Sequence, residues 1–236
     1  FNLYIVRALF WIVFLTGIVD ATLAVMRVEG LLGFFFEQAT VREFTRSAFV
    51  APIFHFPLIV SGFVIAAFTR TLGFTWLALL IVASELLIVF TRFIFSYEQA
   101  LMGDLVRYWY AALFLFASAY TLYDDGHVRV DIIYAGRSSR TKGKLNAIGS
   151  IMLGLVTVWT ILIIGMSGKT SIINAPIVNL EITQTGANGM FIKYQMAAFL
   201  AIFAATMIIQ FVSALFEAVA DSRDEPGKRD NVAAAH

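Results

Sequence analysis

The sequence predicts an all-α, polytopic membrane protein, a helical bundle with about six transmembrane helices. Of its 236 residues, 60% are hydrophobic and only 14% are charged, whereas about 25% of the residues in a typical soluble domain are charged. Several apolar segments approach the roughly 20 residues that a helix needs to cross a bilayer, and the alternating pattern of membrane β-strands is absent. Because lipid cannot satisfy exposed backbone groups, each apolar segment should be a helix.

Six apolar segments are the predicted spans, near residues 3–26, 49–68, 74–95, 105–122, 147–166 and 191–216. The first lacks a basic leader and a clear cleavage site, which favours a retained helix over a signal peptide. Segments 30–47 and 92–104 mix aromatic and charged residues, as amphipathic helices at the membrane interface do. We expect an irregular periplasmic connection at 167–190 and a disordered, cytoplasmic tail at 221–236.

The distribution of basic residues favours an orientation with both termini in the cytoplasm. With six spans, the N-terminus, the 69–73 turn, the 123–146 loop and the tail share one side of the membrane. That side carries nine basic residues and the other six, when Arg7 and Arg107 at helix ends are left out. The positive-inside tendency assigns the richer side to the cytoplasm, so we expect a multi-pass protein with both termini in the cytoplasm.

Ionisable residues inside a span are costly and are considered first for a functional role. Arg7 lies near a helix end and can extend its charge to the interface. Asp20 is about 20 Å farther along the same helix, too far to pair with Arg7. Glu85 lies near the middle of the third span, where a polar contact to a neighbouring helix or partner subunit is favoured over a proton or cation relay.

No motif in the sequence indicates an enzyme or a cofactor. His55 lies between Pro52 and Pro57, where a kink would free backbone carbonyls. It could be considered as a haem ligand, but the chain has only three histidines, and the others lie in a loop and the tail. The absence of cysteine excludes disulfides and thiolate metal sites. A net charge of +1 gives no support for nucleic-acid binding, and no nucleotide-binding, zinc-protease or nucleophile-elbow motif is present.

The loop after the fourth span carries the most distinctive motif, HVRVD at residues 127–131. If this segment is extended, His127, Arg129 and Asp131 lie on one side of it. The arginine between the two potential ligands makes a metal site unfavourable. Contact of Arg129 with lipid phosphates or with a neighbouring protein is the preferred interpretation.

Small residues form a ridge in the last span. They recur at every fourth position: Ala197, Ala201 and Ala205. Such a ridge lets another helix approach closely, and it either packs within the chain or contacts another subunit.

A longer pattern surrounds the HVRVD motif. It reads RYWYAALFLFASAYTLYDDGHVRVDIIY at 107–134, with the basic RSSRTKGK following at 137–144 and with Lys193 and Gln210 in the last span. From about residue 74 to 220, the chain thereby resembles the small permease (Q) subunit of tripartite ATP-independent periplasmic (TRAP) transporters. The resemblance implies a four-helix core at 71–220 with a cytoplasmic HVRVD loop. Residues 1–70 are then two additional N-terminal spans with an interfacial segment.

The resemblance also implies a location in the bacterial inner membrane, a function and partners. The chain would be a non-catalytic scaffold for a large permease subunit, which itself carries an organic acid and any coupling sodium. A periplasmic substrate-binding protein would be an indirect partner, and membrane lipids would surround the helices. Members of the family often have an acidic pair before the second core helix, whereas here only Asp104 can take that position, where it can pair with Arg107.

Two other functions remain open. A protein built on the same core could be a structural subunit of a respiratory or photosynthetic membrane complex, attached through its N-terminal helices. An autonomous carrier is less favoured, because the sequence shows neither paired broken helices at the midplane nor an internal repeat.

Overall fold

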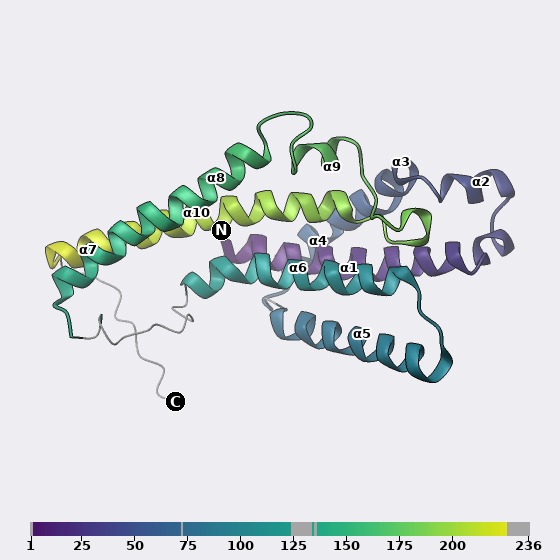
Figure 1. Ribbon diagram of the computed structural model, residues 1–236, viewed down its shortest axis with the longest axis horizontal. Helices are drawn as coiled ribbons and strands as arrows, with labels where there is room; N and C mark the ends of the chain where they lie inside the picture. The colour runs from purple at the N-terminus through teal and green to yellow at the C-terminus, as the bar shows by residue number, and fades with distance from the viewer. Residues whose placement is uncertain (1, 72, 124–133, 135, 226–236) are drawn as a thin grey trace. The chain divides into compact units, whose positions relative to one another are not determined.

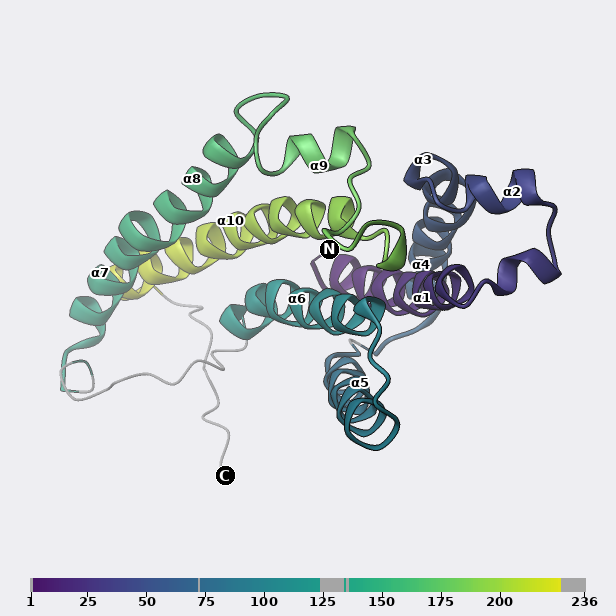
Figure 2. The ribbon, with the colours of Figure 1, turned by 45° about the vertical axis from the view of Figure 1, so that its right-hand side comes forward.

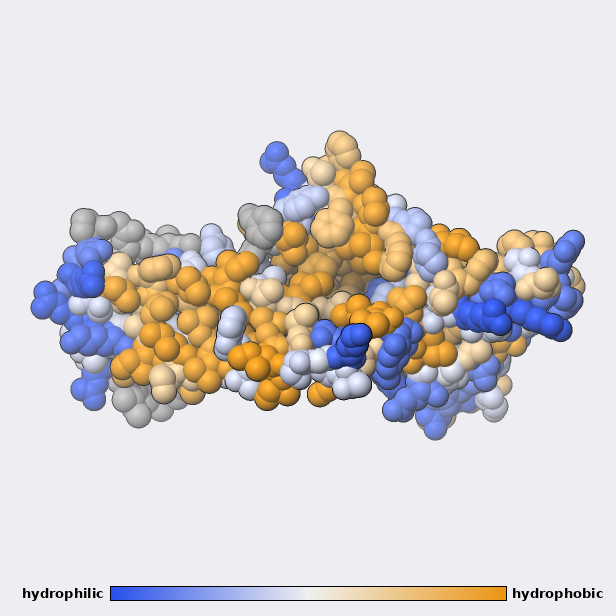
Figure 3. Space-filling model, turned by 90° about the horizontal axis from the view of Figure 1, so that it is seen from above, coloured by the Kyte–Doolittle hydropathy of each residue, from blue (hydrophilic) through white to orange (hydrophobic). Residues whose placement is uncertain are grey.

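The computed structural model describes residues 2–71, 73–123, 134 and 136–225 (Figure 1). Within these residues all regular structure is helical, and six helical spans are long and apolar enough to cross a membrane. They are Leu3–Val28, Ser47–Phe68, Phe74–Phe95, Ala100–Tyr123, Ser139–Gly165 and Lys193–Arg223. Hydrophobic residues cover much of the face drawn in Figure 3, as expected for a surface in contact with lipid. The predicted fold class is confirmed.

The chain divides into two compact units, which are described separately. Unit 1 comprises residues 1–117 and 165–202, and unit 2 comprises residues 118–164 and 203–236. The predicted boundary at residue 70 does not separate the units, because both N-terminal spans lie in unit 1 together with the third span and parts of the fourth and sixth. The division into an N-terminal addition and a family core therefore stays a prediction.

Unit 1 is built around α1 (Asn2–Val28). α1 packs against α4 (Phe56–Phe68), where Gly62 permits a close approach because a Cβ there would lie 2.8 Å from the backbone nitrogen of Ile12. It also packs against α6 (Ala100–Tyr123), whose Trp109 donates its Nε1 proton to the carbonyl of Val13 at 3.3 Å. These contacts place α1 at the centre of the unit (Figure 2).

Shorter elements complete unit 1. α2 (Gln38–Glu43) and α3 (Ser47–Val50) follow α1, and a π-helical turn, Ala51–His55, joins α3 to α4 in one continuous span. α9 (Asn174–Val178) lies in the connection before α10 (Lys193–Arg223). The exposed aromatic side chains of Phe34 and Phe35 are consistent with an interfacial segment at 30–47; its position at the membrane surface stays a prediction.

Unit 2 contains α7 (Ser139–Gly149), a π-helical stretch (Ser150–Leu155) and most of α8 (Val156–Gly165), packed with the later part of α10. A Cβ at Gly143 would lie 2.6 Å from the carbonyl oxygen of Ala218, so α7 and α10 approach closely there. Arg140 pairs with Asp224 at 2.5 Å. Arg140, Lys142 and Lys144 are helical, whereas Arg137 precedes α7, so the predicted loop, which extended to residue 146, ends earlier.

Helix ends differ from the prediction at a second place. The 92–104 segment is not a separate helix, because α5 (Phe74–Phe95) continues to residue 95 and α6 begins at residue 100. Ser96 ends α5 in the left-handed conformation, with φ of 51°. The irregular connection predicted at 167–190 is present, with α9 and a single 3-10 turn (Gly186–Asn188) as its helical elements.

Candidate functional site

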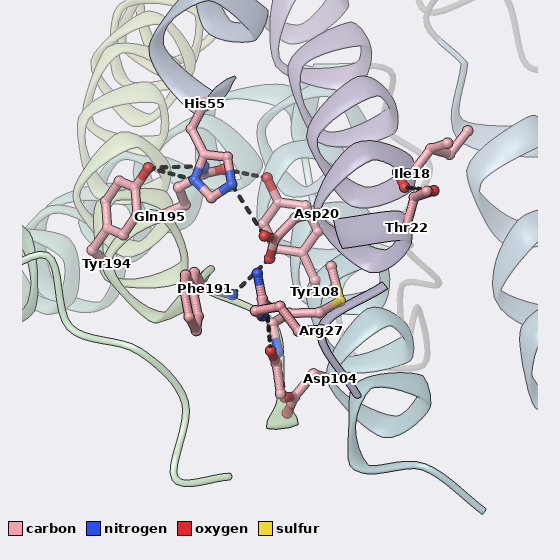
Figure 4. A network of polar contacts seen from close by, with 12 residues as sticks. Ile18, Asp20, Thr22, Arg27, His55, Asp104, Tyr108, Phe191, Tyr194 and Gln195 are labelled. Carbon is pink, nitrogen blue, oxygen red and sulfur yellow. Dashed lines mark hydrogen bonds and ion pairs between the residues drawn. The ribbon is translucent and has the colours of Figure 1, made fainter. Parts of the chain in front are cut away.

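A buried polar cluster joins four elements of unit 1 (Figure 4). Asp20 on α1 and His55 in the π-helical turn are both fully buried, with the Nε2 atom of His55 3.3 Å from Oδ1 of Asp20. The Nδ1 atom of His55 lies 2.8 Å from the hydroxyl of Tyr194 on α10. Two ionisable side chains that lie in different predicted spans thus face each other.

The cluster continues as a chain of hydrogen bonds. Tyr108 on α6 donates to Oε1 of Gln195, and Nε2 of Gln195 donates to the Tyr194 hydroxyl at 3.3 Å. If the Tyr194 hydroxyl donates to Nδ1 of His55, the tautomer that fits this chain carries the His55 proton on Nε2, the atom that faces Asp20. Such a network is strong in a low-dielectric interior because its alternative is unsatisfied polar groups.

Two buried carboxylates hold the segment that leads into α10. Oδ2 of Asp20 accepts the backbone N–H of Phe191 at 2.6 Å. Oδ2 of Asp104 accepts the backbone N–H of Met190 at 3.1 Å and the hydroxyl of Thr183 at 2.9 Å. Because two adjacent amides are bound by carboxylates from α1 and α6, the segment is fixed to both helices.

Arg27, in the last turn of α1, adds a third attachment. Its Nε donates to the carbonyl of Ala187 at 3.2 Å and its Nη2 to the carbonyl of Gly189 at 2.9 Å. Its guanidinium carbon also lies 4.0 Å from the centre of the Phe191 ring, within the range of a cation–π interaction. Gly189 is needed for packing, since a Cβ there would lie 2.5 Å from Oδ2 of Asp104.

The chemistry of this cluster favours a structural tie. Both carboxylates accept hydrogen bonds from the chain's own backbone, and His55 lies between Asp20 and Tyr194. Across the described residues, no group of three or more histidine, aspartate or glutamate side chains could hold a metal ion.

The expected pair of Asp104 and Arg107 is present. Oδ1 of Asp104 lies 3.6 Å from Nη1 of Arg107, with the Asp104 side chain buried and that of Arg107 67% exposed. The Asp104 carboxylate mainly accepts hydrogen bonds from the segment before α10. The sequence did not indicate this contact. A role for this pair in binding a subunit stays a prediction.

Glu85 lies on an exposed part of α5, twelfth of its 22 residues. With 1.5 Å of rise per residue, its Cα is about 16 Å from the start of the helix, near the middle of a hydrocarbon layer of about 30 Å. No hydrogen bond or ion pair joins Glu85 to another described residue. A charged residue at the centre of a lipid-exposed helix costs roughly 2.5–3.5 kcal/mol or more, so this position calls for an external partner.

The remaining predicted site residues are the alanine ridge of the last span and the HVRVD motif. Ala197 and Ala201 are half-buried and Ala205 is exposed, so the contact of this ridge with another subunit stays a prediction. His127, Arg129 and Asp131 lie outside the described residues.

A comparison with known protein families shows which family the chain belongs to. The model of the family "Tripartite ATP-independent periplasmic transporters, DctQ component" matches residues 78–221, more than half of the chain. The chain belongs to this family. A search of curated proteins found no match, and neither did a search of solved structures. This DctQ protein is thus a small, multi-pass membrane subunit of a TRAP transporter.

The polar cluster crosses the edge of the region that the DctQ family model matches. Tyr108, Tyr194 and Gln195 lie inside the matched residues, whereas Asp20 and His55 precede them. The cluster therefore links the two N-terminal spans to the region that the family model matches. The sequence indicated Asp20 and His55 separately, as ionisable residues within spans, but gave no signal for the two α10 residues.

Proposed function

We propose that this DctQ protein is a non-catalytic scaffold that holds the large permease subunit of a TRAP-type secondary transporter for organic acids. The family match supports its place in such a transporter. The observation that carries the scaffold role is the buried polar cluster, which binds α1, the π-helical turn before α4, α6 and α10 to one another.

A scaffold must keep its shape while the transport domain beside it moves. Hydrogen bonds inside a membrane protein resist opening, because the released groups find no water in the bilayer. Asp20 and Asp104 hold adjacent amides of the segment before α10, so this part of the frame is held at two points. An autonomous carrier would instead arrange ionisable groups and broken helices around a midplane site. Asp20 and His55 face each other, which favours the structural role.

The proposal also covers the membrane location, orientation and partners of the protein. We place the protein in the bacterial inner membrane with both termini in the cytoplasm, as the distribution of basic residues favours. The large permease subunit would bind the substrate and any coupling sodium, and a periplasmic substrate-binding protein would deliver the substrate. Membrane lipids would cover the remaining apolar surface, and this chain itself would need no cofactor.

Co-purification from native membranes tests the proposal. The tagged chain is extracted in mild detergent, and the proteins that accompany it are identified by mass spectrometry. We expect a large multi-span permease in stoichiometric amount. Subunits of a respiratory or photosynthetic complex in its place would contradict a role in transport.

Uptake by reconstituted complexes tests the scaffold role itself. Proteoliposomes containing the large subunit, with and without this chain, are given the substrate-binding protein and a labelled organic acid. We expect uptake only when both membrane subunits are present, with substrate affinity of the binding protein unchanged. Full uptake by the large subunit alone would reject the scaffold role.

A further inference from the structure

α5 is the least covered of the six spans that the structure describes. Only 6% of its most apolar stretch is buried, compared with 50% in α1 and 39% in α6. Leu77, near its start, packs in the same cluster as Phe10 of α1, and Figures 1 and 2 draw α5 at the edge of unit 1. In a bilayer, the remaining surface of α5 is covered by lipid or by another protein.

The exposed surface of α5 has two faces of different chemistry. The first is bulky and carries Trp76, Leu79, Leu86, Phe90 and Phe93. The second lies about a quarter of a turn away, and we call it the Glu85 stripe. The stripe comprises Ala78, Val82, Glu85 and Val89, at helical spacings of four, three and four. Its alanine and valine side chains are shorter than the aromatic and leucine side chains of the bulky face, so a neighbouring helix can come closer to the Glu85 carboxylate on the stripe.

The helix itself supplies no partner for the carboxylate. The positions three and four residues away, which are within reach on a helix surface, are all apolar: Ile81, Val82, Ile88 and Val89. Arg92, seven residues on, is about 10 Å farther along the axis and already pairs with Glu98 at 3.4 Å. Lipid tails have no hydrogen-bond donor, so Glu85 needs a donor from another protein.

We propose that the Glu85 stripe is the docking site for a transmembrane helix of the large permease subunit, which presents a hydrogen-bond donor to Glu85 at mid-membrane depth. This inference rests on the proposed function. The charge of the site sets the chemistry of this helix: an arginine, lysine, amide or hydroxyl group on it satisfies the carboxylate. A symmetric dimer of this chain would use the same stripe on both copies and bring two carboxylates together, which is unfavourable.

Site-directed cross-linking tests the stripe directly. The chain has no cysteine, so single-cysteine variants carry one reactive thiol each. Val82→Cys and Val89→Cys lie on the stripe, and Leu79→Cys and Phe90→Cys lie on the bulky face as matched controls, since all four side chains are 47–56% exposed. Each variant is co-expressed with the large subunit and labelled in membranes with a photoactivatable maleimide. We expect cross-links to the large subunit from the stripe and not from the bulky face.

Substitution of Glu85 tests whether the large subunit donates a hydrogen bond to its carboxylate. Glu85→Leu should lower the amount of large subunit that co-purifies with the chain about tenfold, as expected for one lost interhelical hydrogen bond. Glu85→Gln keeps an acceptor and should lower it less. Leu86→Ala, at the neighbouring exposed position on the bulky face, should leave it unchanged. Since Glu85 bonds to no other described residue, the thermal midpoint of the purified Glu85→Leu chain should match that of the wild type.

The outcomes separate the two proposals. Normal co-purification by Glu85→Leu, a cross-linked dimer of this chain, or equal cross-linking of the large subunit from both faces overturns the docking inference and leaves the proposed function standing. If the wild-type chain brings no large permease, the proposed function fails. A stripe that then cross-links to a different membrane protein rejects the proposed occupant as well.

Discussion

Replacing Asp20 with alanine should release the segment before α10 from α1. The carboxylate accepts the Phe191 amide proton at 2.6 Å and faces Nε2 of His55 at 3.3 Å, in a fully buried position. A hydrogen bond to a charged group contributes roughly 1.5–3 kcal/mol, and each buried group left unpaired costs about 1–3 kcal/mol. Removing a buried charge recovers part of this sum, so we expect local opening to become easier by about 3 kcal/mol.

Amide hydrogen exchange measures this opening at the residue concerned. At about 1.4 kcal/mol for each factor of ten, the Phe191 amide should exchange about a hundredfold faster in Asp20→Ala than in the wild type. Asp20→Asn keeps an oxygen acceptor and should show a smaller increase. Thr22→Val is the matched control: Thr22 lies on the exposed side of α1 and its hydroxyl donates to the carbonyl of Ile18 in its own helix.

A second carboxylate provides an internal comparison. Asp104 binds the amide of Met190, next to Phe191. Asp104→Ala should therefore accelerate the Met190 amide more than the Phe191 amide, and Asp20→Ala the reverse. If a folded Asp20→Ala protein retained wild-type exchange at Phe191, Asp20 would not hold this segment, and the case for a frame built on the cluster would fail.

Two further predictions concern the same unit. Gly189→Ala should destabilise it by about 1–3 kcal/mol, because the added Cβ would lie 2.5 Å from Oδ2 of Asp104; its thermal midpoint should fall below that of Gly168→Ala, where nothing lies within 4 Å. The hydrogen bond to Glu29, at 2.5 Å, raises the pKa of Tyr97, so its stabilisation is present while Tyr97 is protonated and is lost as the pH rises through that raised pKa. A nuclear magnetic resonance titration of the tyrosine rings should find this pKa above the ordinary value of about 10, and Glu29→Gln should lower it.

The fold could be predicted because membrane helices are specified by local composition. An apolar stretch of sufficient length must form a helix in lipid, whatever its neighbours are, and all six predicted spans are present as helices. The ends were less predictable. α7 begins eight residues before the predicted span. There Gly143 lies close to Ala218 of α10 and Arg140 pairs with Asp224, just after α10 ends, and composition does not encode these contacts.

The polar cluster could be predicted only in part. Asp20 and His55 were conspicuous because lipid tolerates neither, yet their pairing depends on how α1 packs against the span that contains α4, which hydropathy leaves open. Nothing in the sequence marked Tyr194 and Gln195 as part of a polar cluster, because aromatic and amide residues are common at the start of a span. Glu85 shows the opposite case: the sequence indicated a need for a partner, and within the described residues the chain provides none.

The cluster also bears on the role of the two N-terminal spans. Tyr194 and the Phe191 amide lie in the region matched by the family model, but their partners His55 and Asp20 lie before it. A chain shortened to the matched core would leave buried donors unpaired in a medium without water, which is costly. The matched region of this protein is therefore fitted to its N-terminal spans, and under the proposed function these spans are part of the scaffold.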